Sequence, residues 1–555
     1  GEQMMLRNFK HCFFLGSLFL LITGTLFAQE SIGSPAAKAE FEQGEALRKK
    51  SEFAAAAAAY RRSVELDPDF AEAHGMFIFT SKLSARDPGG DQAKSKAMAD
   101  EMTEKLKALY TEWAQKEPKR ASYQWALGDL NMYKDYAKVE QYSRKAVELD
   151  PKFARAWQTL ALVAEVSGDN AREQEYLKKA ADAAPDNPAY QFYYANSLKH
   201  TDPARYAKAS LAVAERFPAH ERGAQSLYWL AFNETDPAKK LAYLEKLKNQ
   251  FPVAKFNWSS SGMSLLFDVY RKTAPDKALA LAEGMANAIP SGSSNQYWQS
   301  LLAYQKALTQ ARALLEKKEF AEAFNLLSDV KLPRLNDFSD LYKLKVAAAE
   351  GSGNAQKVYD DLLKQTAKEP TDELRSQLLK LGAGLKKTEA QVNADLWQTL
   401  DAQAKPAKTF TLKRYGDEKD VSLGDYRGKV ALLNFWYPFC GPCRGENPSL
   451  QKILKKFGQD KFVILAVNIY PTEDVFVLPY MKGNRFDFIP LRGTEGFAEK
   501  EWGARGYPTN FLIDPQGQVI HRLGPMRGDA SERMFELQIQ MLLERDASQQ
   551  SKKSE

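Results

Sequence analysis

Two kinds of hydrophobic pattern follow one another along this chain of 555 residues. From about residue 37 to about residue 400, apolar positions recur at helical spacing in an alanine-rich background, which predicts amphipathic helices. From about Pro406 onward, short β-like apolar runs alternate with helical segments, which predicts an α/β domain. We therefore expect a multidomain protein in which an all-α region precedes an α/β fold, with Lys405-Pro406-Ala407 at the join.

A proline closes successive helix pairs of the first region at nearly constant intervals. The intervals are 33, 34, 33 and 34 residues, between Pro118, Pro151, Pro185, Pro218 and Pro252. This period is typical of tetratricopeptide repeats, and residues 37–252 resemble that family. The resemblance implies a solenoid whose concave face holds a peptide or a partner protein, with a scaffold or spacer as the alternative. Beyond residue 252 the spacing loosens, and we expect degenerate helical hairpins over 253–400.

The second region has a definite order of expected elements. They are a hairpin from Phe410 to Leu423, a strand over 430–435, a helix after Cys443, a strand over 462–469, a helix near 473–482, strands over 510–513 and 519–523, and a helix over 531–543. Asp514-Pro515-Gln516-Gly517 is a turn signal between the last two strands. The order is β-α-β followed by β-β-α.

Two cysteines separated by two residues, Cys440 and Cys443, lie where an apolar strand gives way to a helix. At a helix start, unpaired backbone amides and the helix dipole stabilise a thiolate, which is the species that attacks disulfides. The same spacing also occurs in half of a zinc site, but the chain has only one other cysteine, Cys12, and five histidines. A structural disulfide is a further alternative, although so short a loop gives little stabilisation. We favour a reversible redox pair with no metal and no cofactor.

Three features together resemble the thioredoxin superfamily, and within it the TlpA/ResA-like extracytoplasmic thiol-disulfide oxidoreductases. They are Cys-Gly-Pro-Cys after a strand, Tyr507-Pro508-Thr509 before a hairpin, and the segment from Gly428 to Trp436. The resemblance covers residues 406–545. It implies that Cys440 is the attacking thiolate and the more exposed sulfur, and that Cys443 is the resolving thiol. It also implies that Pro508 is a cis-proline beside which the backbone of Tyr507 pairs with an extended substrate segment.

Proton handling is expected to depend on an acid within the helix. Asn434 stands where cytosolic thioredoxins have a buried acid, and an amide cannot accept the proton. Glu446, three residues after Cys443, matches an acid of the ResA-like branch. One helical turn from the resolving sulfur, Glu446 can take that thiol's proton if burial raises its pKa; the alternative is an exposed helix acid.

The aromatic residues near the motif are expected to form the substrate-binding surface. We expect Trp436 to pack beside the disulfide, and Trp436, Phe439, Tyr507 and Pro508 to contact the substrate. A peroxiredoxin would need a threonine three residues before its reactive cysteine, and Tyr437 occupies that position.

The first residues resemble an export signal. Arg7 and Lys10 precede an apolar run from Phe13 to Phe27, and Ala28 offers a small residue for cleavage. Leu26 is large for its place before the cut, so an uncleaved membrane anchor is the alternative. The expected boundaries are a signal peptide at 1–28, a linker at 29–36, tetratricopeptide-like repeats at 37–252, degenerate hairpins at 253–400, a linker at 401–409, a thioredoxin-like domain at 410–545 and a disordered tail at 546–555.

These features predict a periplasmic or secreted thiol-disulfide oxidoreductase that acts on protein thiols or disulfides. Gly441-Pro442 matches reducing thioredoxins and favours a reductase, which then needs a separate membrane electron donor. The formal net charge of +6 is small for this length, and acids interleave with the basic residues, so nucleic acid is not an expected partner. The alternative function is a tetratricopeptide scaffold whose thioredoxin-like domain is a redox sensor or clamp.

Overall fold

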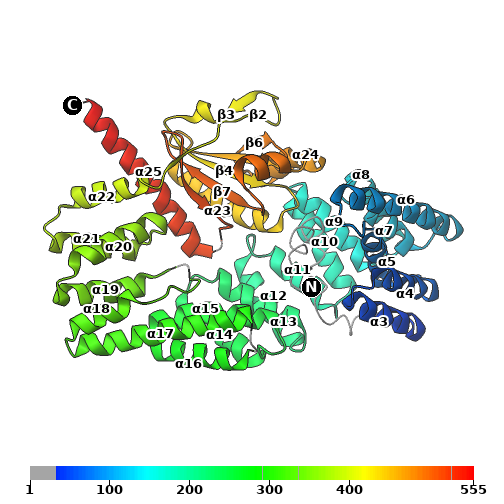
Figure 1. Ribbon diagram of the computed structural model, residues 1–555. Helices are drawn as coiled ribbons and strands as arrows, with labels where there is room; N and C mark the ends of the chain where they lie inside the picture. The colour runs from blue at the N-terminus through cyan, green and yellow to red at the C-terminus, as the bar shows by residue number, and fades with distance from the viewer. Residues whose placement is uncertain (1–32, 290–291, 336, 527, 555) are drawn as a thin grey trace. The chain divides into compact units, whose positions relative to one another are not determined.

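The computed structural model describes residues 33–289, 292–335, 337–526 and 528–554 (Figure 1). The expected signal peptide at 1–28 and the first residues of the expected linker at 29–36 lie outside these ranges. The chain divides into two compact units. The first ends at Arg222 and includes Lys482–Asn484, and the second comprises Gly223–Met481 and Arg485 onward. Within the described ranges, no helix is both long enough and apolar enough to cross a lipid bilayer.

The first unit consists of antiparallel helix pairs. They are α3 (Pro35–Lys49) with α4 (Phe53–Leu66), α5 (Ala71–Ser84) with α6 (Gln92–Lys116), α7 (Ala121–Asp129) with α8 (Tyr136–Leu149), α9 (Ala154–Val166) with α10 (Asn170–Ala183), and α11 (Pro188–Ser197) with α12 (Pro203–Arg216). Gly44 lets α3 approach α4, because a Cβ there would lie 2.7 Å from the ring of Tyr60. Trp125, 1% exposed, lies in the shared core.

The helix pairs continue into the second unit. They are α13 (Glu221–Asn233), α14 (Pro237–Gln250), α15 (Asn257–Thr273), α16 (Pro275–Ala288), α17 (Ser293–Glu316), α18 (Phe320–Ser328), α19 (Ser339–Ser352), α20 (Ala355–Lys368), α21 (Asp372–Gly384) and α22 (Glu389–Asp401). The all-α fold expected for this stretch is confirmed. The unit boundary falls within α13 and not near residue 400.

Residues 405–554, called the α/β part below, contain a mixed sheet with helices. Its elements are β1 (Lys405–Pro406), β2 (Thr411–Lys413), β3 (Asp420–Ser422), η1 (Leu423–Tyr426), β4 (Val430–Trp436), α23 (Gly441–Phe457), β5 (Phe462–Asn468), η2 (Pro471–Glu473), α24 (Asp474–Gly483), β6 (Ile489–Arg492), η3 (Phe497–Glu501), β7 (Thr509–Ile513), β8 (Gln518–Leu523) and α25 (Gly528–Ser554). The sheet order is β1-β8-β7-β4-β5-β6. β5 is parallel to β4 and β6, whereas β7 is antiparallel to β4 and β8. Every residue of β4 and β5 is buried, as expected for central strands covered on both faces.

Three expectations about this part differ from the structure. β6 was not expected, because Pro490 breaks its apolar run; the strand lies at the sheet edge, where proline is tolerated. The expected linker at 401–409 contributes β1, which pairs with β8. The expected disordered tail at 546–555 continues as helix α25 through Ser554, since neither proline nor glycine interrupts it after Gly528.

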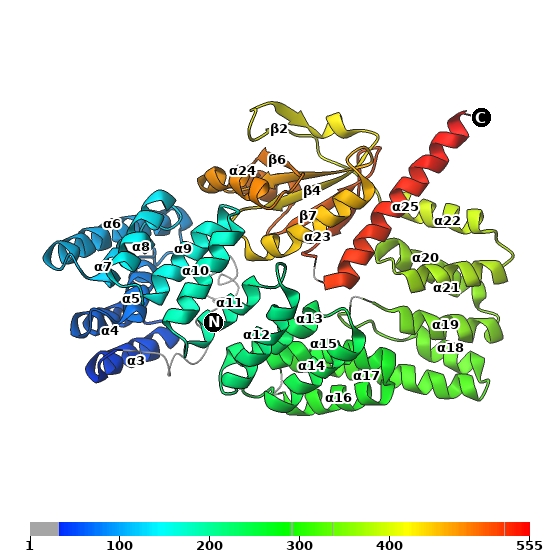
Figure 2. The ribbon, with the colours of Figure 1, turned by 180° about the vertical axis from the view of Figure 1, so that it is seen from behind.

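Helix α25 connects the helical hairpins of the second unit to the sheet. It lies against α22, α23 and β4 (Figures 1 and 2). Arg545, 1% exposed, pairs with Asp401 at 2.5 Å and with Asp514 at 2.6 Å. Gln538 donates to the carbonyl of Lys368 at 3.2 Å. These contacts explain why hairpin helices and the sheet form one unit.

Replacing Arg545 with Met should destabilise the second unit. Removal of the guanidinium leaves the buried Asp514 carboxylate without its ionic partner, and breaking a buried pair in this way costs about 3 kcal/mol. Urea unfolding of the full chain measures the loss. Lys380→Met is the control, because its pair with Glu350 is exposed on both sides and contributes less than about 1 kcal/mol. Equal effects of the two substitutions would contradict this account of α25.

Candidate active site

The two cysteines lie where β4 gives way to α23. Cys440 is the N-cap of α23, and its Sγ accepts a hydrogen bond from the backbone N–H of Cys443 at 3.2 Å. The two residues form a disulfide with Cα atoms 5.2 Å apart. When the pair is reduced, the same N–H and the helix N-terminus stabilise a thiolate on Cys440. The geometry therefore favours Cys440 as the nucleophile of the pair.

Both cysteines are buried in this oxidised form. Cys440 is 2% exposed and Cys443 is 0% exposed, so the expected greater exposure of Cys440 is marginal. Three tyrosine rings form a cluster beside the motif, with the ring centroid of Tyr437 4.7 Å from that of Tyr470 and 6.1 Å from that of Tyr507. The cluster brings the segment before Pro508 next to the residues that lead into the disulfide.

Glu446 is buried beneath the motif, one helical turn after Cys443. Its side chain is 1% exposed and accepts hydrogen bonds from Asn434 Nδ2 at 3.1 Å and from Asn510 Nδ2 at 3.2 Å. The backbone N–H of Met526 donates to its second oxygen at 2.9 Å. Burial raises the pKa of Glu446 to about 7, although the three donors oppose the rise. Burial of this acid was the condition for the expected proton transfer, and the structure meets it.

Asn434 takes part in the same network from the centre of the sheet. It pairs in register with Asn510 of β7, and its Nδ2 donates to Asn510 Oδ1 at 2.7 Å. Neither Asn510 nor Met526 was expected at the site, because their approach to Glu446 depends on the strand order. The register pair could be anticipated only once β7 is placed beside β4.

Glu473 is a second buried carboxyl at the site, and it was not expected. It is 6% exposed and accepts a hydrogen bond at 2.9 Å from the backbone N–H of Phe439, the residue before Cys440. Burial raises the pKa of Glu473 to about 7, while the Phe439 N–H and Arg444 act in the opposite direction. In the sequence, Glu473 resembles an ordinary acid at the start of a helix. Its position in the site follows from the fold of η2.

The residues expected to bind substrate are all buried, but they lie in different parts of the site. The Tyr507–Pro508 peptide bond is cis, as the resemblance implied. Tyr507 is 8% exposed and Phe439 is 6% exposed, and the Phe439 ring packs against Phe476 at 5.5 Å. Trp436 is fully buried, with its ring 5.5 Å from that of Tyr480. Trp436 therefore belongs to the core behind the motif. Phe439, Tyr507 and Pro508 are also buried, and their contact with a substrate stays a prediction.

Comparison with known proteins bears out both resemblances. A model of the AhpC/TSA family matches residues 404–522, and a tetratricopeptide-repeat model matches residues 37–70. The thioredoxin-like protein YneN of Bacillus subtilis is 32% identical over 138 residues, which are 24% of this chain and 79% of YneN. The thiol:disulfide interchange protein HelX of Rhodobacter capsulatus is 31% identical over 128 residues, 22% of this chain and 70% of HelX. The chain belongs to the thioredoxin-like family of thiol-disulfide oxidoreductases.

Further similarities concern the same part of the chain. The thiol-disulfide oxidoreductase ResA of Bacillus subtilis is 32% identical over 102 residues, which are 18% of this chain and 56% of ResA. A solved thiol:disulfide interchange protein from Chlorobium tepidum is 27% identical and covers 26% of this chain and 99% of its own, with a TM-score of 0.23. Crystalline StoA from Bacillus subtilis is 26% identical over 23% of this chain and 96% of its own, with a TM-score of 0.21.

The two buried carboxyls should make stability depend on pH. With a pKa of about 7 in the folded protein against 4.5 for an ordinary glutamate, Glu446 binds a proton in the folded state where the unfolded state has lost it. Stability therefore falls as pH rises from about 4.5 to about 7, by roughly 3 kcal/mol per group, and levels off above. Urea unfolding at a series of pH values measures this slope.

Glu446→Gln should remove about half of this slope, and a double substitution with Glu473→Gln should remove most of it. Glu501→Gln is the control, because Glu501 is exposed and pairs with Lys408 at 3.2 Å. A slope that is the same in Glu446→Gln and in the unsubstituted protein would show that Glu446 is ionised throughout this pH range.

Proposed function

We propose that this protein exchanges the Cys440–Cys443 disulfide with thiols and disulfides of protein substrates. The observation that supports this most is a disulfide at a helix N-terminus with the buried carboxyl of Glu446 one turn beyond it. A structural disulfide has no need of a nearby acid that titrates near neutral pH. An exchanging pair needs a proton acceptor there, because each turn of the cycle removes a proton from Cys443.

In the reducing direction, the reaction takes place in two steps. The Cys440 thiolate attacks one sulfur of a substrate disulfide; a mixed disulfide forms, and the other substrate sulfur leaves as a thiolate that takes a proton. Cys443 gives its proton to Glu446, and its thiolate attacks Cys440 Sγ, which releases the second substrate sulfur. The substrate gains two electrons and the protein ends with the disulfide. An outside dithiol then reduces Cys440–Cys443 again.

Residues around the disulfide also position the reacting groups. Glu473 accepts the N–H of Phe439 and so fixes the backbone that carries Cys440. The resemblance to thioredoxins implies that the backbone of Tyr507 pairs with an extended substrate segment, which adds to it as a further strand. Phe439 precedes Cys440 and Tyr507 precedes Pro508, and both are expected to contact the substrate when it reaches the disulfide.

The remaining parts of the proposal concern direction, place and partners. Gly441-Pro442 is the dipeptide of reducing thioredoxins, which favours a reductase. We place the protein outside the cytoplasm, secreted, periplasmic or anchored by its N-terminal segment, and a membrane electron donor then restores its thiols. The tetratricopeptide repeats capture partner proteins on their concave face and bring them to the redox site.

A second function is favoured by one observation, the burial of both sulfurs. A disulfide that is 2% and 0% exposed at its two cysteines suits a sensor or clamp that opens only under strong reduction. In that case the repeats are the working part and the α/β part reports the redox state. Turnover separates the two functions, because a clamp does not cycle with a protein disulfide.

Replacing Glu446 with Gln should slow release of the substrate thiol from the mixed disulfide by about a hundredfold at pH 7. The difference should shrink above pH 9, where a cysteine thiol ionises without help. Rapid acid quenching and alkylation of the full-length protein, reduced and then mixed with insulin, measures the rate. Glu501→Gln should match the unsubstituted protein.

Two outcomes would contradict the proposal in different ways. Equal release rates for Glu446→Gln and the unsubstituted protein would remove the proton-accepting role from Glu446. An unsubstituted protein that reacts once and never cycles in the presence of excess dithiol would favour the clamp.

A further inference from the structure

A cavity of about 1070 Å³ lies inside the second unit, apart from the disulfide. One wall comes from the helical hairpins, at the C-terminus of α15, the last turns of α17 and the N-termini of α19 and α21. The other wall comes from the segment after β8 and the first turns of α25. A volume of this size accommodates a small organic molecule.

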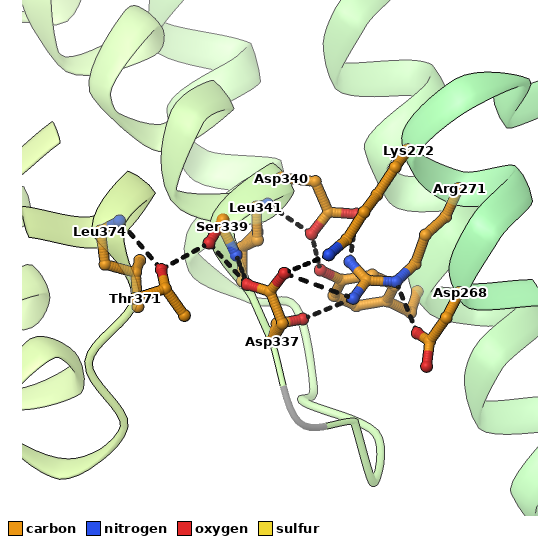
Figure 3. Close-up of polar contacts among 10 residues, drawn as sticks. Asp268, Arg271, Lys272, Asp337, Ser339, Asp340, Leu341, Thr371 and Leu374 are labelled. Carbon is orange, nitrogen blue, oxygen red and sulfur yellow. Dashed lines mark hydrogen bonds and ion pairs between the residues drawn. The ribbon is translucent and has the colours of Figure 1, made fainter. Parts of the chain in front are cut away.

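Most charged groups in the helical wall neutralise one another (Figure 3). Arg271, only 2% exposed, pairs with Asp268 and with Asp340, each at 2.9 Å. Lys272 pairs with Asp337 at 2.6 Å. Burial opposes ionisation of Asp337, but Lys272 and a serine hydroxyl outweigh it and lower the pKa of Asp337 to about 2. These groups form a fixed part of the wall and are not free to hold a ligand.

The same wall is tied to the next helix by hydroxyl groups. Ser339 Oγ donates to Asp337 at 2.5 Å and lies 3.0 Å from Thr371 Oγ1. Thr371 Oγ1 in turn accepts the backbone N–H of Leu374 and caps α21 (Figure 3). The ends of α15, α19 and α21 are therefore held together before any ligand arrives.

Two cations of the lining are not neutralised. Arg312 of α17 and Lys343 of α19 make no ion pair with a carboxylate within 4.0 Å in the described part of the chain. Arg533 is already paired with Asp372 at 2.6 Å. Glu373 is the one carboxylate of the lining without an ionic partner, so the unpaired groups retain an excess of positive charge.

The opposite wall carries a partly exposed apolar patch beside Ser531 and Arg533. It includes Leu523, Pro525, Met526 and Met534. Methionine side chains adapt to ligands of different shape, which suits a binding surface. We propose that the cavity binds a small amphipathic anion, whose charged group meets Arg312 and Lys343 while its apolar body covers Met526 and Met534.

The cavity also reaches the network around Glu446. Asn510 and Met526 line it, and both donate hydrogen bonds to the Glu446 carboxyl. A ligand that packs on Met526 therefore restricts the motion of the backbone N–H that donates to Glu446. This coupling, unlike the site itself, rests on the proposed function: ligand binding alters the rate of thiol release through Glu446.

Isothermal titration of the full-length oxidised protein tests the site with three probes. Decanoate has the tail and the charge; decyltrimethylammonium has the tail with the opposite charge; acetate has the charge without the tail. We expect decanoate to bind at least tenfold more tightly than either of the others. Equal binding of the two decyl probes, or no binding of decanoate, would overturn the proposal.

Two kinds of variant locate the bound probe. Arg312→Glu with Lys343→Glu should weaken decanoate at least tenfold, whereas Lys306→Glu should not, since Lys306 is an exposed cation of α17 outside the lining. Ala530→Trp fills the apolar end without changing charge and should also weaken binding at least tenfold. Decanoate affinity unchanged in both the double variant and Ala530→Trp would place the probe elsewhere and refute the site.

The coupling has its own readout. Saturating decanoate should change the rate of thiol release at pH 7 in the unsubstituted protein by at least threefold and leave Glu446→Gln unchanged. Tight binding with an unaltered release rate would overturn the coupling while the site stands. If the unsubstituted protein binds decanoate but does not exchange thiols with insulin, the proposed function is contradicted and the cavity site stands.

Discussion

The Glu446 carboxyl holds four separate segments of the α/β part together. It lies on α23 and takes hydrogen bonds from Asn434 of β4, from Asn510 of β7 and from the backbone of Met526 after β8. A buried carboxyl is tolerated only where hydrogen-bond donors meet it, and these donors come from β4, from β7 and from the segment after β8. The same contact fixes the helix that carries both cysteines and forms one edge of the cavity. The chemistry and the packing of the site thus depend on one group.

The regular features of the fold could be predicted from local pattern, and the irregular ones could not. Prolines at intervals of 33 and 34 residues indicate the repeats, because each interval is one helix pair. The edge strand β6 carries Pro490, which hides it from any search for apolar runs. The packing of α25 against the helical hairpins and the unit boundary at residue 222 depend on contacts between distant residues. Arg545 and Asp401, for example, are 144 positions apart.

The candidate site divides in the same way. Cys440, Cys443 and Glu446 lie within two turns of one helix, so their spacing alone predicts their neighbourhood. Glu473 and Asn510 reach the site from other elements, and nothing in their own sequence context distinguishes them from ordinary polar residues. Trp436 was expected to contact the substrate because it is an aromatic residue beside the motif. The structure places it in β4, a strand buried on both faces, which the sequence alone did not indicate.

The proposed function requires that the Cys440–Cys443 bond open and close reversibly in the folded protein. The most direct measurement equilibrates the full-length protein in dithiol–disulfide buffers of graded potential and counts alkylated cysteines. We expect one reversible two-electron transition with a midpoint below about −250 mV, in the range of reducing thioredoxins. A thiol count that stays the same at every potential, or a transition that cannot be reversed, would contradict it.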